Sequence, residues 1–305
     1  MPSDTHIINI DENDAVDLHL HTVVYDGFWT PETLVDYTHQ QGFRVIAVAD
    51  HDSTANVNPT RELAAKNGIA VLPAVEVTAR FDGVVQHLLL YGVDINDPAF
   101  LQLLGDLRQA QIASAERGLA EFRRRGLDLP HLEAIVAGRN LMPFYVVLAL
   151  LKAAHAKSYE EAVDLGRDLG IDFDIAVDMA EAIRVAHRQG ALAILAHPGR
   201  AELGYSPATF ERIEGMMAIG LDGLEVYHGL HGEEDIARYG QFAAEHGLMV
   251  SCGSDSHGPK SRTRPTPWPA GHCRRLLEAV GFAVRGSRPI TERSASKPSP
   301  AQECP

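Results

Sequence analysis

Residues 15–22 read AVDLHLHT, a short apolar strand pattern that carries two histidines at its end. The same arrangement recurs further along the chain. The apolar run VIAVA at 45–49 is followed by Asp50-His51-Asp52, and ALAILA at 191–196 is followed by His197. Apolar runs of this length that end in polar groups predict buried strands. The polar groups are then expected at the strand ends.

Strand patterns of this kind alternate with helical patterns on both sides of a helical block. Alternation predicts parallel β-α units and the α/β class. We predict a closed or distorted seven-stranded (β/α)7 barrel, with an open sheet as the alternative. The expected strands lie at 15–20, 45–49, 69–75, 84–91, 191–196, 223–227 and 248–252.

The helical block divides the expected barrel into two sequence segments. We predict that residues 15–97 and 179–286 form the barrel and that 98–178 form a helical insertion subdomain. The segment 287–305 is rich in serine and proline. Segments of that composition bury little apolar surface, so we predict that this tail is poorly ordered.

Polar side chains follow or interrupt the expected strands at positions that a barrel would bring together. In a parallel barrel the carboxyl ends of the strands meet at one mouth, where active sites lie. Histidines mixed with carboxylates suit zinc, manganese or iron, and a group this large predicts two or three divalent ions. A single histidine such as His87 would, on its own, more often be a packed core residue. The candidate ligands are His19, His21, Asp26, His51, Glu76, His87, His197, Asp255 and His257.

Five ordered motifs resemble the PHP (polymerase and histidinol phosphatase) family of metal-dependent phosphoesterases. They are DLHLHT at 17–22, ADHDS at 49–53, AVEVT at 74–78, AHPGR at 196–200 and GSDSH at 253–257. The resemblance implies a distorted (β/α)7 barrel with a two- or three-metal centre, and its ligand positions fall on the same nine residues. The branch with a helical insertion, which includes nucleotide phosphatases, looks most similar.

One segment departs from that branch, in which Ser and Arg residues of the insertion grip a substrate phosphate. The corresponding stretch, 141–151, reads LMPFYVVLALL and contains no Ser, Arg or Lys. It is expected to be either a core helix of the insertion or an apolar substrate wall. Arg200 remains as a candidate phosphate-binding residue, because a guanidinium pairs with phosphate through two hydrogen bonds. A loop salt bridge is the alternative for Arg200.

The resemblance implies hydrolysis of a small phosphate ester, most simply a nucleotide or sugar monoester, by a metal-bridging hydroxide. We expect Asp255 to orient that hydroxide or take its proton. His228 is the candidate for protonating the leaving group and His231 for binding substrate, with solvated loop histidines as the alternative. The apolar insertion leaves open a phosphodiester, a phosphotriester, or an amide or lactone. A non-catalytic metal-binding or partner-binding module is a third hypothesis.

The composition restricts the classes of partner. The chain has 305 residues, with 27 Lys and Arg against 41 Asp and Glu, for a formal net charge of −14. A charge of this sign disfavours broad binding of nucleic acid or anionic membrane. Three scattered cysteines and an acidic, polar beginning favour a cytoplasmic protein. We expect a small-molecule phosphoester substrate, no nucleic acid polymer and no membrane; the oligomeric state is left open.

Overall fold

The computed structural model describes residues 7–201 and 206–286; the predicted tail at 287–305 lies outside the described residues. The strands are β1 Ile8–Asp11, β2 Ala15–Leu20, β3 Phe43–Val48, β4 Ala70–Phe81, β5 Val84–Tyr91, β6 Val177–Asp178, β7 Leu192–Leu195, β8 Gly223–His228, β9 Met249–Gly253, β10 Trp268–Pro269 and β11 Phe282–Arg285. They form a large sheet of order β10-β2-β3-β4-β5-β7-β8-β9, with β6 beside β4, and a small parallel β1-β11 pair.

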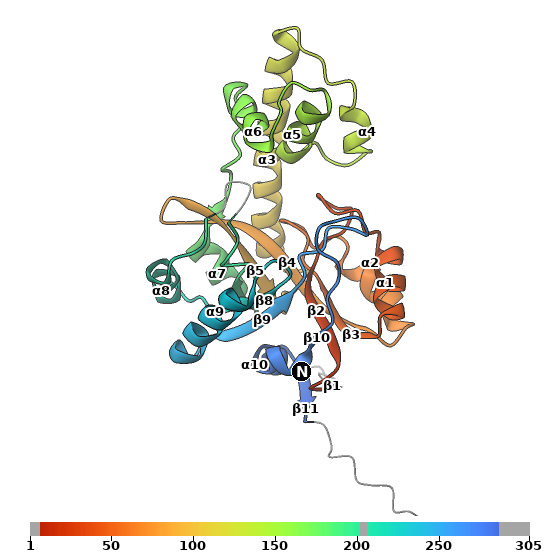
Figure 1. Cartoon of the computed structure of the whole chain (residues 1–305), viewed down its shortest axis with the longest axis vertical. Coiled ribbons are helices and arrows are strands. Elements are labelled where there is room, and N and C mark those ends of the chain that lie inside the picture. Colours follow the sequence, from red (N-terminus) through yellow and green to blue (C-terminus); the bar gives the residue numbers. More distant parts are fainter. Residues whose placement is uncertain (1–6, 202–205, 287–305) are drawn as a thin grey trace, which may run out of the picture.

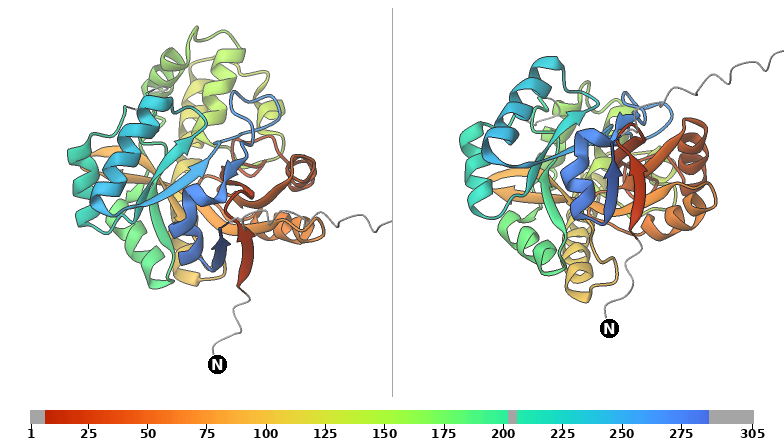
Figure 2. Two further views of the ribbon diagram at one scale, coloured as in Figure 1. Left: turned by 60° about the horizontal axis from the view of Figure 1, so that its bottom comes forward. Right: turned by 90° about the horizontal axis from the view of Figure 1, so that it is seen from below.

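The large sheet curves into a nearly closed barrel, in which seven strands from β2 to β9 follow one another (Figures 1 and 2). The ring closes where β2 meets the segment after β9. There the Asp255 backbone N–H donates to the His19 carbonyl at 2.9 Å, and the His21 N–H donates to the Ser256 carbonyl at 3.1 Å. The predicted fold class, a distorted α/β barrel, is confirmed. The closure also brings the first motif with candidate ligands, at 17–22, next to the last one, at 253–257.

The prediction of parallel strands throughout is wrong for β5. This strand runs antiparallel to both β4 and β7. The reason is the two-residue turn Asp82-Gly83, in which both residues have positive φ, 48° and 75°. Such a turn produces a hairpin, whereas a parallel connection needs a dozen or more residues. β4 also continues beyond the predicted end at 75, so Glu76 lies inside the strand and His87 lies in the middle of β5.

Helices cover the outside of the barrel on two sides (Figure 1). α1 and α2 pack against β3 and β4, and α7, α8 and α9 pack on the opposite side. α10 closes the end of the barrel away from the insertion, where Leu276 and Leu277 join the interior core. The helices are α1 Pro31–Gln40, α2 Val57–Ala65, α3 Pro98–Arg124, α4 Leu132–Val136, α5 Pro143–Lys152, α6 Tyr159–Asp168, α7 Met179–Arg188, α8 Phe210–Ala218, α9 Glu233–His246, the 3₁₀ helix η1 Ala270–Cys273 and α10 Arg274–Ala279.

The helices α4, α5 and α6 stand at one end of the molecule, together with the second half of α3 (Figure 1). α3 belongs to two cores. Phe100 and Leu104 in its first half pack into the barrel's outer core, whereas Ala115 and Phe122 in its second half pack with α5 and α6. The long helix therefore holds the insertion above the barrel. No helix in the described residues is long and apolar enough to cross a membrane.

The apolar stretch 141–151 serves as a core helix and also reaches a cavity. In α5, Val146, Val147 and Leu150 are buried in the insertion's own core. Pro143 and Phe144, at the start of the same helix, line a cavity that opens over the barrel mouth. The two expectations for this stretch therefore apply to different residues of one helix.

Candidate metal centre

Glu76 is the middle of the polar cluster at the barrel mouth. Its Oε2 lies 3.2 Å from Nε2 of both His19 and His21, which sit two residues apart on one face of β2 and the residue after it. The Asp255 carboxylate approaches from the loop after β9, with Oδ1 3.0 Å from His21 Nε2. These four buried residues could hold one metal ion.

Three further imidazoles lie against the two oxygens of the same Glu76 carboxylate. Its Oε2 lies 3.2 Å from His51 Nδ1, and its Oε1 lies 3.0 Å from both His87 Nδ1 and His197 Nε2. His51 follows β3, His197 follows β7, and His87 lies in mid-β5, diagonally across the hairpin from Glu76. A second group, which contains His51, Glu76 and His87, could hold another ion.

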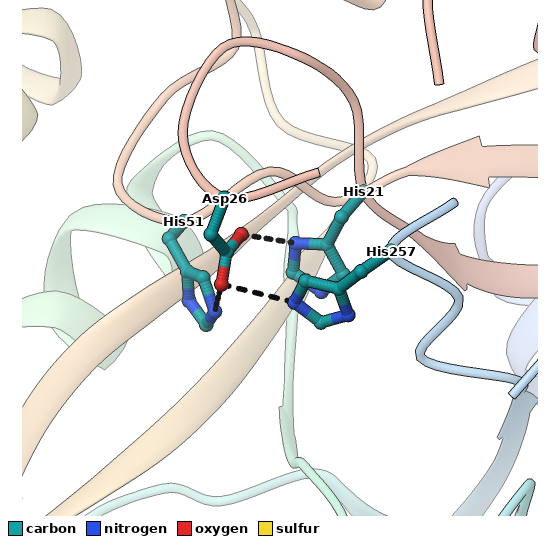
Figure 3. Close-up of side chains that lie close together, drawn as sticks. All are labelled: His21, Asp26, His51 and His257. Carbon is teal, nitrogen blue, oxygen red and sulfur yellow. Dashed lines mark hydrogen bonds and ion pairs between the residues drawn. The ribbon is translucent and has the colours of Figure 1, made fainter. Parts of the chain in front are cut away.

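A third group forms around Asp26, in the loop between β2 and α1 (Figure 3). Asp26 Oδ2 lies 3.0 Å from His257 Nε2 and 3.7 Å from His51 Nε2. Its Oδ1 lies 3.9 Å from His21 Nδ1. The three groups contain eight of the nine predicted ligands, and His21, His51 and Glu76 each belong to two of them. His197 is in none of the groups but joins the cluster through its contact with Glu76.

Burial and mutual charge set the protonation of the cluster. Burial would raise the pKa of the Glu76 carboxyl, but His19, His51 and His87 hold that pKa well below its usual range. The pKa of Asp255 is likewise held low, against burial, by His257 and His19. Burial lowers the pKa of His51 to about 3 and that of His197 to about 4. Both shifts favour the uncharged imidazole, the form that keeps a lone pair for a ligand bond.

The donor atoms fit divalent metal ions. Six buried atoms of the cluster lack a well-formed hydrogen bond within the described part of the chain: His19 Nε2, His21 Nδ1, His21 Nε2, Asp26 Oδ1, His51 Nδ1 and Glu76 Oε2. Buried polar atoms are normally satisfied, so a group of such atoms aimed at one another requires an explanation. Imidazole nitrogens and carboxylate oxygens are ligands for zinc, manganese and iron. A metal centre accounts for these atoms.

A buried carboxylate behind the cluster was not predicted. Glu225 in β8 is fully buried; its Oε1 lies 2.9 Å from His19 Nδ1 and its Oε2 accepts the His197 backbone N–H at 2.8 Å. Gly253 makes room for it, because a Cβ at that position would lie 2.1 Å from His19 Cβ and 2.7 Å from Glu225 Oε1. The one sequence signal was an acidic residue within the apolar strand GLEVYH.

Changing Glu225→Gln should weaken metal binding without unfolding the protein. The amide keeps the shape of the side chain but can no longer accept from both His19 and the His197 backbone. Loss of such a carboxylate partner typically costs about 10–100-fold in metal affinity. Metal content after dialysis against a graded chelator measures the effect, and Glu245→Gln on the exposed face of α9 is the control. Equal retention in both variants would show that Glu225 does not orient His19.

The other predicted site residues occupy different positions around Asp255. His228 is buried, and its Nε2 lies 3.6 Å from Asp255 Oδ2. Arg200 Nη1 lies 3.7 Å from the same oxygen. His231 does not reach the cluster: its Nε2 accepts the Gly199 N–H at 3.1 Å, so its Nδ1 donates to the Val226 carbonyl at 2.9 Å. Both of its ring nitrogens therefore bind backbone groups.

A cavity of about 410 Å³ lies between the metal cluster and the insertion. Asp26, His51, His87 and His257 form its floor, and Arg200 lies at its side. The opposite wall comes from α5, α6 and the segment that follows α6. A volume of this size is typical of a small-molecule site. The candidate metal centre thus opens into a space that could hold a substrate.

Sequence comparison places the chain beside enzymes that hydrolyse phosphate esters. A phosphoribosyl 1,2-cyclic phosphate 1,2-diphosphodiesterase from Eggerthella lenta is 30% identical over 257 residues, which cover 81% of this chain and 95% of that relative. The chain belongs to the PHP family of metal-dependent phosphoesterases. It is therefore a hydrolase of the PHP type. No family model matches the chain.

Other PHP relatives differ in the substrates that their names state. A 3',5'-nucleoside bisphosphate phosphatase from Chromobacterium violaceum is 27% identical and covers 80% of this chain and 87% of its own length. A 5'-3' exoribonuclease Rnm from Salmonella typhimurium is 30% identical, and the alignment covers 85% of this chain and 89% of that relative. A Bifidobacterium adolescentis protein of known structure, assigned to the metal-dependent phosphoesterases, has a TM-score of 0.73 at 26% identity. The match covers 87% of this chain and 96% of that protein. The phosphoesterase class is shared, whereas the substrate varies.

Proposed function

We propose that this PHP protein hydrolyses a small phosphate monoester, such as a nucleotide or sugar phosphate. The observation that carries the proposal is the cavity of about 410 Å³ whose floor is formed by four of the candidate ligands, Asp26, His51, His87 and His257. We further propose that the cluster holds two or three divalent ions, with manganese, zinc or iron as candidates. The three overlapping groups of ligands support that number.

Bound divalent ions would lower the pKa of a coordinated water towards neutrality and take up negative charge on the phosphoryl oxygens. The chain's own residues position the reactants. Asp255 has Oδ1 turned to His21 and Oδ2 turned to His228 and Arg200. This carboxylate therefore lies between the ligand cluster and the cationic side of the cavity, where it could orient the attacking water and take its proton.

His228 is held as a hydrogen-bond donor. Its Nδ1 accepts the Leu230 backbone N–H at 3.2 Å, so the neutral ring carries its proton on Nε2. That Nε2 lies 3.6 Å from Asp255 Oδ2, so its N–H is directed at this carboxylate. We propose that His228 donates a hydrogen bond from this N–H to the leaving oxygen; protonating that oxygen would need a doubly protonated ring, whose Nδ1–H would replace the hydrogen bond from Leu230. His231, in contrast, fixes the turn at Gly199 that precedes Arg200.

Arg200 is proposed to bind the substrate phosphate, and Arg200→Ala should therefore raise KM more than it lowers kcat. Loss of a charged hydrogen-bonding partner of an anion predicts a fall in kcat/KM of about 10–100-fold for a phosphomonoester. Arg200→Lys keeps the positive charge but loses the planar guanidinium that forms two parallel hydrogen bonds, so it should recover part of the lost kcat/KM. Arg184→Ala, on the exposed surface of α7, is the control. A KM unchanged in Arg200→Ala would assign Arg200 to a loop salt bridge instead.

A phosphodiester or a carbonyl compound is the second candidate substrate. Pro143 and Phe144 line the cavity from the stretch where cationic and hydroxyl side chains were expected, and the Eggerthella lenta relative is named as a diphosphodiesterase. An extended RNA strand fits less well, because acidic side chains line the far wall of the cavity and would repel successive phosphates. We therefore propose that the substrate is not a nucleic acid polymer.

A substrate panel tests the proposed function. Protein reconstituted with Mn²⁺ would be assayed against nucleotides, sugar phosphates and an aryl phosphomonoester, beside an aryl phosphodiester and an aryl lactone. We expect turnover of at least one class of monoester. Turnover of the diester or the lactone alone would transfer the function to the second candidate. Metal-loaded protein inactive on the whole panel would contradict hydrolysis at this centre.

A further inference from the structure

The insertion supplies the wall of the cavity that lies opposite the cluster of candidate metal ligands. We call this wall the distal wall. Its inner part is apolar, with Phe144 from α5, Tyr159 and Val163 from α6, and Phe173 and Ile175 from the segment after α6. A leaving group bound with its phosphate at the metal cluster would extend towards these side chains. Aromatic rings and branched aliphatic groups bind an apolar face better than a strongly hydrated one.

The polar part of the distal wall is acidic. Four carboxylates line it: Glu160, Asp164, Asp172 and Asp174. The pKa of Glu160 is lowered by hydrogen bonds at the start of α6, so this carboxyl is ionised at neutral pH. In the described lining of the cavity, the basic side chains near these four carboxylates are fewer than the carboxylates.

Two arginines are the cationic side chains of the described cavity lining, and each of them lies beside a carboxylate. Arg200 lies at the metal end beside Asp255. Arg167 belongs to the distal wall, but its Nη1 lies 3.6 Å from Asp164 Oδ1 and its Nη2 3.8 Å from Asp174 Oδ1. The distal wall therefore carries a formal charge of −3.

We propose that the distal wall selects substrates with a single phosphate, whose leaving group has an apolar face and no further negative charge. A second phosphate would face a wall with a net charge of −3, and like charges in a partly enclosed cleft repel. A positively charged leaving group would be favoured by the same carboxylates and by the nearby aromatic rings. This inference rests on the proposed function and specifies its substrate class. It separates the chain from relatives named for bisphosphate or RNA substrates.

Four substrates that share one reacting bond test the proposal. They are phenyl phosphates with a para-CH₂ group that bears trimethylammonium, hydroxyl, carboxylate or phosphonate, and release of the substituted phenol is measured for each. The methylene group keeps the reactivity of the phenol similar across the series. With Mn²⁺-loaded protein we expect kcat/KM to fall in that order, by about 10-fold or more between the cationic and the carboxylate compound. Equal or inverted values would overturn the proposal.

A charge-reversed variant separates the distal wall from the rest of the protein. Asp164→Lys with Asp174→Lys changes two exposed residues and reverses the charge of the wall. We expect the ratio of kcat/KM for the carboxylate compound over the cationic one to rise by about 10-fold or more. The matched control is Glu214→Lys with Glu245→Lys, which makes the same change in net charge on α8 and α9, away from the cavity. An equal change of the ratio in both double variants would contradict a local effect.

Binding of non-hydrolysable analogues distinguishes failure of this proposal from failure of the proposed function. Benzylphosphonates with the same four substituents would be titrated calorimetrically into Mn²⁺-loaded protein. The proposal predicts the same order of Kd as for kcat/KM. Absence of turnover with this order of Kd would contradict the proposed hydrolysis and leave the charge selectivity supported. Turnover with no order in Kd or kcat/KM would support hydrolysis and overturn the selectivity.

Discussion

Replacement of Glu76 by alanine should remove at least one metal ion per chain and reduce kcat/KM roughly 1,000-fold, equivalent to about 4 kcal/mol of transition-state stabilisation. The expectation follows from its position. The Glu76 carboxylate lies within 3.2 Å of five imidazoles and belongs to two of the three ligand groups. No other carboxylate in the described cluster could replace it from the same side. Metal content by mass spectrometry and phosphate release together measure the effect.

The control for Glu76→Ala is Glu62→Ala on the exposed surface of α2, which should retain both metal and activity. The far-ultraviolet circular dichroism spectrum of Glu76→Ala should remain that of the wild type, because the change removes repulsion among buried charges as well as attraction. Wild-type metal content in Glu76→Ala would show that Glu76 is not a ligand, and the assignment of the centre would be wrong.

Asp17→Ala should be the most destabilising single change outside the ligands, at about 3 kcal/mol of the free energy of unfolding. Its Oδ1 accepts the backbone N–H groups of His19 and Ser254, at 3.2 and 3.0 Å, and its Oδ2 accepts the Thr266 N–H at 2.8 Å. The alanine variant would leave these buried donors unpaired. Asp17 thereby joins β2 to the segment after β9, the position at which the barrel closes.

Urea unfolding of metal-free protein measures the effect of Asp17→Ala. Asp17→Asn should lose less, because the amide oxygen can still accept two of the three N–H groups. Asp36→Ala, on the exposed side of α1, is the control and should change the free energy of unfolding by less than about 0.5 kcal/mol. A loss below about 1 kcal/mol for Asp17→Ala would mean that these hydrogen bonds do not hold the closure.

Much of the barrel could be predicted because its strands are local patterns. AVDLHL at 15–20 and VIAVA at 45–49 are buried strands within a residue or two of the expected bounds. The direction of β5 was missed, although Asp82-Gly83 is a recognisable hairpin turn. The parallel β1-β11 pair joins Ile8–Asp11 to Phe282–Arg285 across nearly the whole chain. A pairing between such short, distant segments leaves no local signal.

The candidate ligands could be predicted because strand ends converge in a barrel, and even His87 was included despite its mid-strand position. The residues that surround these ligands could not be predicted from the sequence. Glu225 and Asp17 are recognisable only when their hydrogen-bonded partners are in place. The distal wall depends on how α5 and α6 pack over the mouth, which sequence patterns do not specify. Sequence patterns therefore predicted which residues gather at the barrel mouth, whereas the lining of the cavity above them required the structure.

The most direct test of a metal-dependent phosphoesterase at this cluster is a Mn²⁺ titration of phosphate release. Metal-stripped protein would be assayed with an aryl phosphomonoester at increasing ratios of Mn²⁺ to protein, beside Asp255→Asn. We predict no release without metal, a rise to a plateau at about two to three equivalents, and background release by the variant at every ratio. Release that is independent of added Mn²⁺, or equal in wild type and Asp255→Asn, would contradict the account.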